Sequence, residues 1–74
     1  MKLRREKREQ MRQKILEFLK NADGHIASIP MLARAIQASS PTAKSIVFEL
    51  EVERKVRVVR LGNDYIVQLE KGGE

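Results

Sequence analysis

The chain has 74 residues, of which 42% are hydrophobic and 34% charged, so it can form one small globular domain with a limited core. It has no cysteine and one histidine, which excludes disulfides, thiolate zinc sites and a histidine-based metal centre. No apolar segment approaches the roughly 18 residues of a membrane span, and no signal peptide follows the basic start. We therefore expect a cytoplasmic protein that needs no cofactor.

The net charge of +5 is concentrated at the N-terminus. Residues 1–14 contain two glutamates and seven basic residues, which are Lys2, Arg4, Arg5, Lys7, Arg8, Arg12 and Lys14. This excess of five equals the net charge of the whole chain, so the remaining residues are formally neutral. Basic segments of this kind commonly contact nucleic acid, although the same composition suits a solvated helix end. Residues 1–10 offer only Leu3 for burial, so we expect an arm that does not pack, either disordered or continuous with the next helix.

The first predicted helix covers residues 11–21. Its apolar residues follow the i, i+4, i+7, i+8 spacing of one buried helix face, and they are Met11, Ile15, Phe18 and Leu19. Gly24 can adopt the left-handed conformation that follows a helix end. Leu16 lies off this face, where it either widens the core or contacts a second subunit.

Residues 25–27 are too short to assign alone, and His25 is interpreted as a solvated loop residue. The second predicted helix covers residues 28–37. Ser28 can be its N-cap and Pro30 suits its first turn, where a missing N–H has no cost. Its inner face is predicted to be Leu32, Ala33 and Ile36.

Residues 38–40 form a turn, and a third helix is predicted from there to about Arg54. Ser39 or Ser40 can cap it, with Pro41 in the first turn. The predicted buried stripe is Ala43, Ile46, Val47 and Leu50. The other face is small and polar for two turns, whereas Glu49, Glu51 and Glu53 crowd the C-terminal half. A helix that enters the major groove N-terminus first has this polarity, although acidic residues can also simply solvate a face.

Residues 55–70 are predicted to form a hairpin around the turn Leu-Gly-Asn-Asp. On its second strand, Tyr65, Val67 and Leu69 share one face. On its first strand the inward set is either Val56 with Val58 or Val59 with Leu61. Residues 71–74 are a tail.

The expected order is helix, short strand, helix, helix, strand, strand. With the segment LARAIQASSPTAKSIVFELE at its centre, this order resembles the winged helix-turn-helix family of bacterial and archaeal regulators over residues 11–69. The segment KILEFLKNADG also resembles the first helix of small pilus-operon regulators of the PapI and FaeA type. The resemblance implies a mainly helical domain at residues 11–70 with a small antiparallel hairpin, and a short first strand with Ile26 pointing inward. The chain departs from the family at Gln37-Ala38 and Arg54-Lys55, where family members usually have glycine.

The resemblance and the polarity of the third helix together predict a protein that binds double-stranded DNA. The residues expected to reach base edges are Ser40, Thr42, Lys44, Ser45 and Phe48. The residues expected to neutralise phosphates are Arg4, Arg5, Arg8, Arg12, Arg57 and Arg60. Such a protein is a transcriptional regulator or a plasmid or phage accessory factor.

One module of this size buries only about 600–1,000 Å² on DNA, so we expect a homodimer or a cooperative array, with Leu16 at the candidate interface. The alternative is a protein-interaction module in a larger nucleic-acid-handling assembly, in which Phe48 and Val52 form an apolar docking stripe. An enzyme is not expected, because the chain has no catalytic constellation and no length to enclose a pocket. No metal or small-molecule ligand is expected either.

Overall fold

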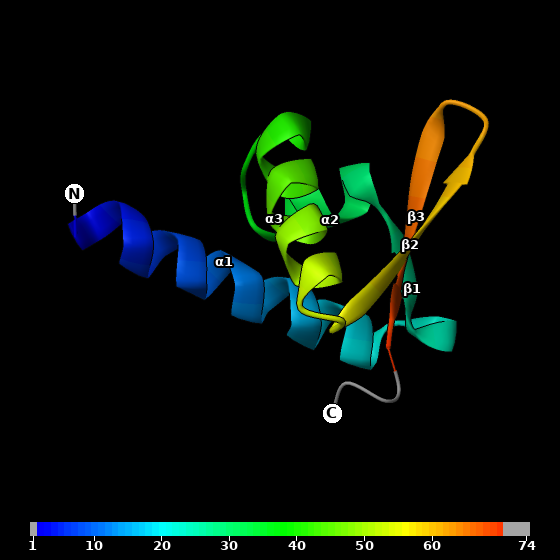
Figure 1. The fold of residues 1–74 in the computed structure, drawn as a ribbon, viewed down its shortest axis with the longest axis horizontal. Helices are drawn as coiled ribbons and strands as arrows, with labels where there is room; N and C mark the ends of the chain where they lie inside the picture. Colours follow the sequence, from blue (N-terminus) through cyan, green and yellow to red (C-terminus); the bar gives the residue numbers. More distant parts are fainter. Residues whose placement is uncertain (1, 71–74) are drawn as a thin grey trace.

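The computed structural model describes residues 2–70, with side chains from residue 5 onward. The predicted tail at residues 71–74 and the side chain of Arg4 lie outside this description. The elements follow the order helix, short strand, helix, helix, strand, strand (Figure 1), with a single 3-10 turn at Asp23–His25 before the first strand. This order confirms the predicted fold class: three helices with a small antiparallel sheet in a winged-helix arrangement.

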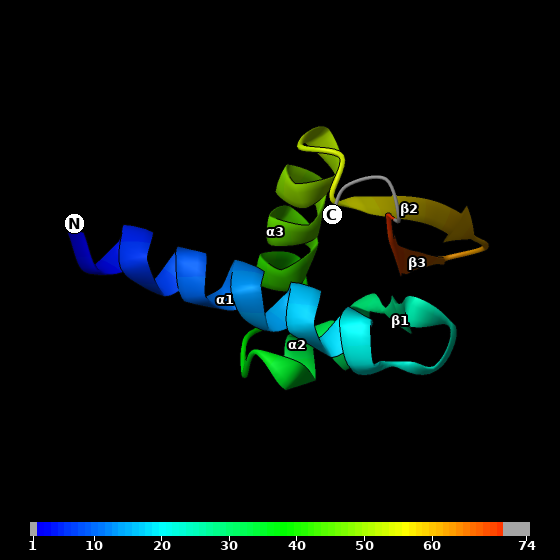
Figure 2. The ribbon, with the colours of Figure 1, turned by 90° about the horizontal axis from the view of Figure 1, so that it is seen from below.

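Helix α1 covers Lys2–Asn21, so the N-terminal arm is helical and continuous with the predicted first helix. Its N-terminal half projects past the rest of the domain in both views (Figures 1 and 2). Its C-terminal half anchors it, because Ile15 and Leu19 are fully buried. Leu16 also packs partly against the core, which is the first of its two predicted roles.

Helices α2 (Ile29–Ala35) and α3 (Ser40–Val52) begin at serine caps. The hydroxyl of Ser28 accepts a hydrogen bond from the backbone N–H of Met31, and that of Ser39 accepts one from Thr42. Of the two predicted caps for α3, Ser39 is therefore the one used. Each cap satisfies one of the N–H groups that have no partner inside a helix, and a proline follows it in the first turn.

The C-terminal ends of α2 and α3 share an uncommon backbone feature. Gln37 and Arg54 follow these ends with positive φ angles of 55° and 62°. At α2 the N–H of Ala38 donates to the carbonyl of Ala33, and at α3 the N–H of Lys55 donates to that of Leu50. These are the bonds of a Schellman cap, which usually places glycine at the left-handed position. At these two sites, where the winged helix-turn-helix proteins that the chain resembles usually have glycine, other residues thus adopt the left-handed conformation.

The sheet consists of β1 (Ile26–Ser28), β2 (Val56–Leu61) and β3 (Asp64–Leu69) in the antiparallel order β1-β3-β2. Val56 and Val67 are buried and Val58 packs against them, which selects the first of the two inward sets predicted for β2. The prediction that Ile26 points inward is wrong. Ile26 is 44% exposed and Ala27 is buried instead, because Ala27 pairs with Val67 and shares its face of the sheet.

The core lies between the three helices and one face of the sheet. It contains the predicted stripes of α1, α2 and α3, joined by Ile29 and by the strand residues Ala27, Val56 and Val67. The buried stripe of α3 is confirmed, since all four of its residues are fully inaccessible. Among residues 2–70, no helix combines the length and apolar character needed to cross a membrane.

Candidate nucleic-acid interface

Helix α3 presents a narrow outward face opposite its buried stripe. Ser40, Pro41 and Ser45 are exposed on it, and Phe48 and Val52 continue it towards the C-terminus at 36% and 83% exposure. Because burial of Ala43, Ile46, Val47 and Leu50 fixes the rotation of the helix, these side chains must point away from the core. The residues predicted to reach bases are thus not sealed inside the domain.

Thr42 differs from its neighbours in this predicted set. Its backbone N–H donates to the Ser39 hydroxyl, and its own hydroxyl lies 3.0 Å from that of Ser39. It is half-buried. Thr42 therefore serves first to close the N-terminus of α3, and its hydroxyl is the least available of the predicted base contacts.

Tyr65 of β3 links α3 to the wing, the hairpin formed by β2 and β3. The ammonium group of Lys44 lies 4.6 Å from the centre of the Tyr65 ring, and the Phe48 ring meets the Tyr65 ring edge to face with centroids 5.7 Å apart. Both contacts are favourable interactions of an aromatic quadrupole. The sequence pattern places Tyr65 on one face of the hairpin with Val67 and Leu69 but does not reveal that it contacts two of the predicted base-contact residues.

The middle of α1 packs against the opposite flank of α3 through a four-residue charge cluster of Arg8, Arg12, Glu49 and Glu53. Arg8 donates to Glu49 with nitrogen–oxygen distances of 2.8 and 3.0 Å, and to the Ser45 hydroxyl at 3.0 Å. Arg12 donates to Glu49 at 2.8 Å and also to Glu53. The prediction that residues 1–10 do not pack is therefore wrong at Arg8, because α1 is long enough to carry this side chain across to α3.

The pairing shifts the pKa values of the carboxylates in this charge cluster. The hydrogen bond from Arg8 is the largest influence on Glu49 and lowers its pKa; burial opposes this shift, and Arg12 lowers the pKa further. The hydrogen bond from Arg12 lowers the pKa of Glu53 in the same way. Glu49 and Glu53 are thus ionised and neutralised by Arg8 and Arg12 of α1 near pH 7.

The two arginines of the wing differ from Arg8 and Arg12 in their surroundings. Arg57 and Arg60 occupy positions of opposite parity on β2, so their side chains leave opposite faces of the hairpin. Both are exposed, and within residues 5–70 neither forms an ion pair. Arg60 only donates a long hydrogen bond of 3.4 Å to the carbonyl of Gly62 at the turn. Arg5, on α1, is likewise exposed without a carboxylate partner in the described part of the chain.

The arrangement therefore brings together most of the predicted site. The outward face of α3 lies between Arg8, which reaches it from α1, and the wing, which reaches it through Tyr65. Among residues 5–70, no group of three or more histidine or carboxylate side chains is placed to hold a metal ion. Comparison with known protein families and with curated proteins finds no match to this chain.

Proposed function

We propose that this chain is a DNA-binding protein that places α3 in the major groove and its wing on the flanking phosphates. The observation that carries this proposal is the outward face of α3, which is accessible from Ser40 to Val52 and has no unpaired acidic side chain across its first two turns. Major grooves admit a helix of this kind, and short hydroxyl and apolar side chains can meet base edges and thymine methyl groups there.

The arginines of the different elements differ in whether they are free to contact phosphates. Arg57 and Arg60 are available for phosphates, together with Arg5 on α1, whereas Arg8 and Arg12 must first exchange a glutamate for a phosphate. Contacts to phosphates supply salt-dependent affinity and fix the register on the duplex but do not read sequence. Sequence preference then rests on Ser40, Ser45 and Phe48, with Lys44 beside them.

The cellular role that fits is that of a cytoplasmic transcriptional regulator or a plasmid or phage accessory factor, similar to winged helix-turn-helix regulators. The chain is small and acts without a cofactor in this proposal. A single module covers little DNA, so binding by two copies or by a cooperative array is part of the proposal.

The test is fluorescence anisotropy with duplexes selected from a random library, titrated from about 50 to 200 mM salt. We expect selection of a common motif and an affinity that falls steeply with salt, since several phosphates are neutralised. Failure to retain any duplex at the lowest salt would refute the proposal.

One observation favours a second candidate function. Val52 is 83% exposed and lies four residues after the exposed Phe48, so the C-terminal half of α3 offers an apolar stripe. In this alternative the stripe docks on another protein of a nucleic-acid-handling assembly. Val52→Asp and Phe48→Ala would then abolish partner capture, and the wing arginines could be removed without consequence.

A further inference from the structure

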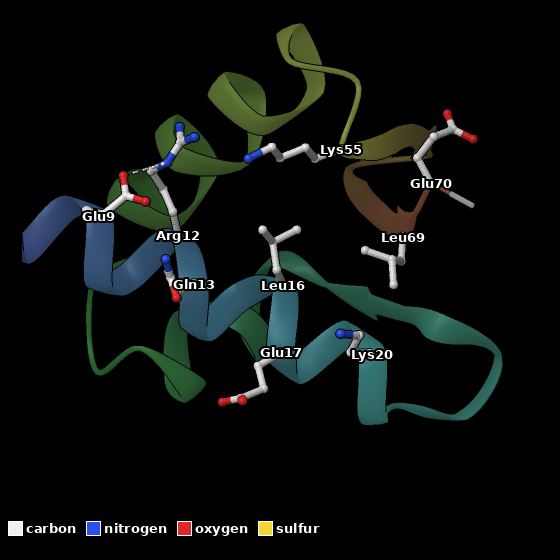
Figure 3. A pocket seen from close by; sticks show the side chains of 9 residues that line it. All are labelled: Glu9, Arg12, Gln13, Leu16, Glu17, Lys20, Lys55, Leu69 and Glu70. Carbon is white, nitrogen blue, oxygen red and sulfur yellow. Dashed lines mark ion pairs between the residues drawn. The ribbon is translucent and has the colours of Figure 1, made fainter. Parts of the chain in front are cut away.

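An open groove of about 390 Å³ runs along α1 on the side that faces the end of the sheet (Figure 3). Leu16 of α1 and Leu69 of β3 form its apolar floor, and both are only partly buried by the core. Charged side chains of both signs stand around this floor, including Glu17 and Lys20 from α1. None of the residues that line it belongs to the outward face of α3, and Arg12 of the charge cluster is the one lining residue that the groove shares with the candidate nucleic-acid interface.

The six residues that α1 contributes to this groove have an internal symmetry. If a second α1 lies antiparallel to the first, with the twofold axis between positions 14 and 15, Glu9 faces Lys20 of the second copy. Arg12 then faces Glu17, and Gln13 faces Leu16. Each acidic residue meets a basic one, and the reverse pairs form on the other side of the axis. Isologous interfaces require self-complementarity of this type, because the same patch must fit itself.

We propose that the groove is occupied by α1 of a second copy of this chain, in an antiparallel contact that buries Leu16 and Leu69. The mixed charges of the rim select this occupant, since a strongly acidic or basic partner would meet like charges at half of the positions. Within one chain, Glu9 already pairs with Arg12 at 3.3 Å (Figure 3), and Arg12 also binds Glu49 and Glu53, so in each intermolecular pair one partner also has a contact in its own chain.

This inference supplies the surface for the pairing that the proposed function includes, yet it does not depend on DNA. The experiment is sedimentation equilibrium of the full chain without nucleic acid, over a range of concentrations. We expect the wild-type protein to reach twice its monomer mass of 8.5 kDa. Lys20→Glu places two carboxylates opposite each other at both ends of the contact and is expected to raise the dimer dissociation constant roughly tenfold.

Two further variants make the result specific. The double variant Glu9→Lys with Lys20→Glu restores opposite charges across the twofold axis and is expected to restore the dimer. Lys14→Glu is the matched control, because Lys14 is an exposed cation of α1 that does not line the groove, and it should dimerise like the wild type. A wild-type protein that stays monomeric, a Lys20→Glu variant as dimeric as the wild type, or equal dissociation by Lys14→Glu would each overturn the proposal. DNA binding by a strictly monomeric wild type would leave the proposed function standing while removing this interface.

Discussion

The arginine pair Arg8 and Arg12 of α1 and the pair Arg57 and Arg60 of the wing have equal formal charge but differ in what that charge can do. Arg8 and Arg12 face two glutamates of α3, so their cluster is electrically neutral as a whole. Arg57 and Arg60 are exposed and pair with no carboxylate among the described residues. The number of basic residues in the sequence of α1 thus overestimates the positive charge that α1 presents to a ligand. The wing has fewer basic residues, but both of its arginines are exposed.

The two sets also differ in what they stabilise. The Arg12 side chain is only 13% exposed and joins α1 to the C-terminal half of α3, so it contributes to the fold. The wing arginines are exposed and form no ion pair among residues 5–70, so their removal leaves no carboxylate unpaired there. We therefore expect the two sets to separate in experiment: one should govern DNA affinity, and the other stability.

The largest effect is expected from the double variant Arg57→Ala with Arg60→Ala. Loss of two phosphate contacts should weaken binding to every duplex by roughly tenfold to a hundredfold near 0.1 M salt, and should reduce the slope of log affinity against log salt by about 1.8. Fluorescence anisotropy at several salt concentrations measures both quantities.

The matched control removes two cations outside the proposed interface, Lys14 and Arg34, which are both exposed. It lowers the net charge equally but should change the affinity far less. Equal losses in the two double variants would show that overall charge, and not the wing, determines affinity.

Arg12→Ala is expected to have the largest effect on stability among these arginines. It removes a mostly buried side chain and its charge-assisted hydrogen bonds to Glu49 and Glu53, so the free energy of unfolding should fall by about 1–3 kcal/mol. Urea denaturation followed by circular dichroism measures this change. Arg57→Ala serves as the comparison, since an exposed substitution usually stays within about 0.5 kcal/mol.

Much of this fold could be predicted from the sequence, because helix caps and buried stripes are local patterns. Ser28, Pro30 and the spacing of Ala43, Ile46, Val47 and Leu50 carry this information within a few residues. The strand β1 is different: with three residues, its inward side chain is decided by pairing with β3, which placed Ala27 inside and Ile26 outside. The non-glycine turns at Gln37 and Arg54 were visible as departures from the family, but their retained left-handed backbone was not.

The candidate site was predictable only in part, for a similar reason. The face of α3 follows from helical periodicity, whereas the charge cluster joins residues separated by 37 to 41 positions. No local pattern reports that α1 continues far enough to bring Arg8 against Ser45 and Glu49. The role of Tyr65 was equally hidden, because its contacts with Lys44 and Phe48 depend on how the wing folds back onto α3.

The cluster also predicts how stability responds to acid. The pKa values of Glu49 and Glu53 are lowered in the folded state from the ordinary value of a glutamate, mainly by hydrogen bonds from Arg8 and Arg12, so their ionised forms stabilise the native structure. This contribution is complete above the unfolded-state pKa and disappears as the pH falls through the folded-state values. Thermal denaturation between pH 7 and pH 3 should show this loss below about pH 4.5. The stability of Arg12→Ala should fall less over this pH range than that of the wild type. If the two proteins lose stability equally, the interaction of the glutamates with Arg12 is not the cause of the acid sensitivity.

The smallest expected effect tests whether the neutrality of the cluster restrains DNA binding. Glu49→Gln removes the carboxylate that holds Arg8 while keeping the size and helix propensity of the side chain. Arg8 then becomes available to a phosphate, and a negative charge beside the groove is lost, so affinity for any duplex should rise about twofold to fivefold at low salt. Because the released Arg8 would contact a phosphate and not a base, the increase in affinity should be equal for selected and random duplexes and should vanish at high salt. In Glu49→Gln combined with Arg8→Ala it should also disappear. If affinity instead falls only for the selected duplex, Glu49 positions Arg8 to read bases. The α1 arginines would then contribute to sequence specificity, whereas the wing arginines contribute only to overall affinity.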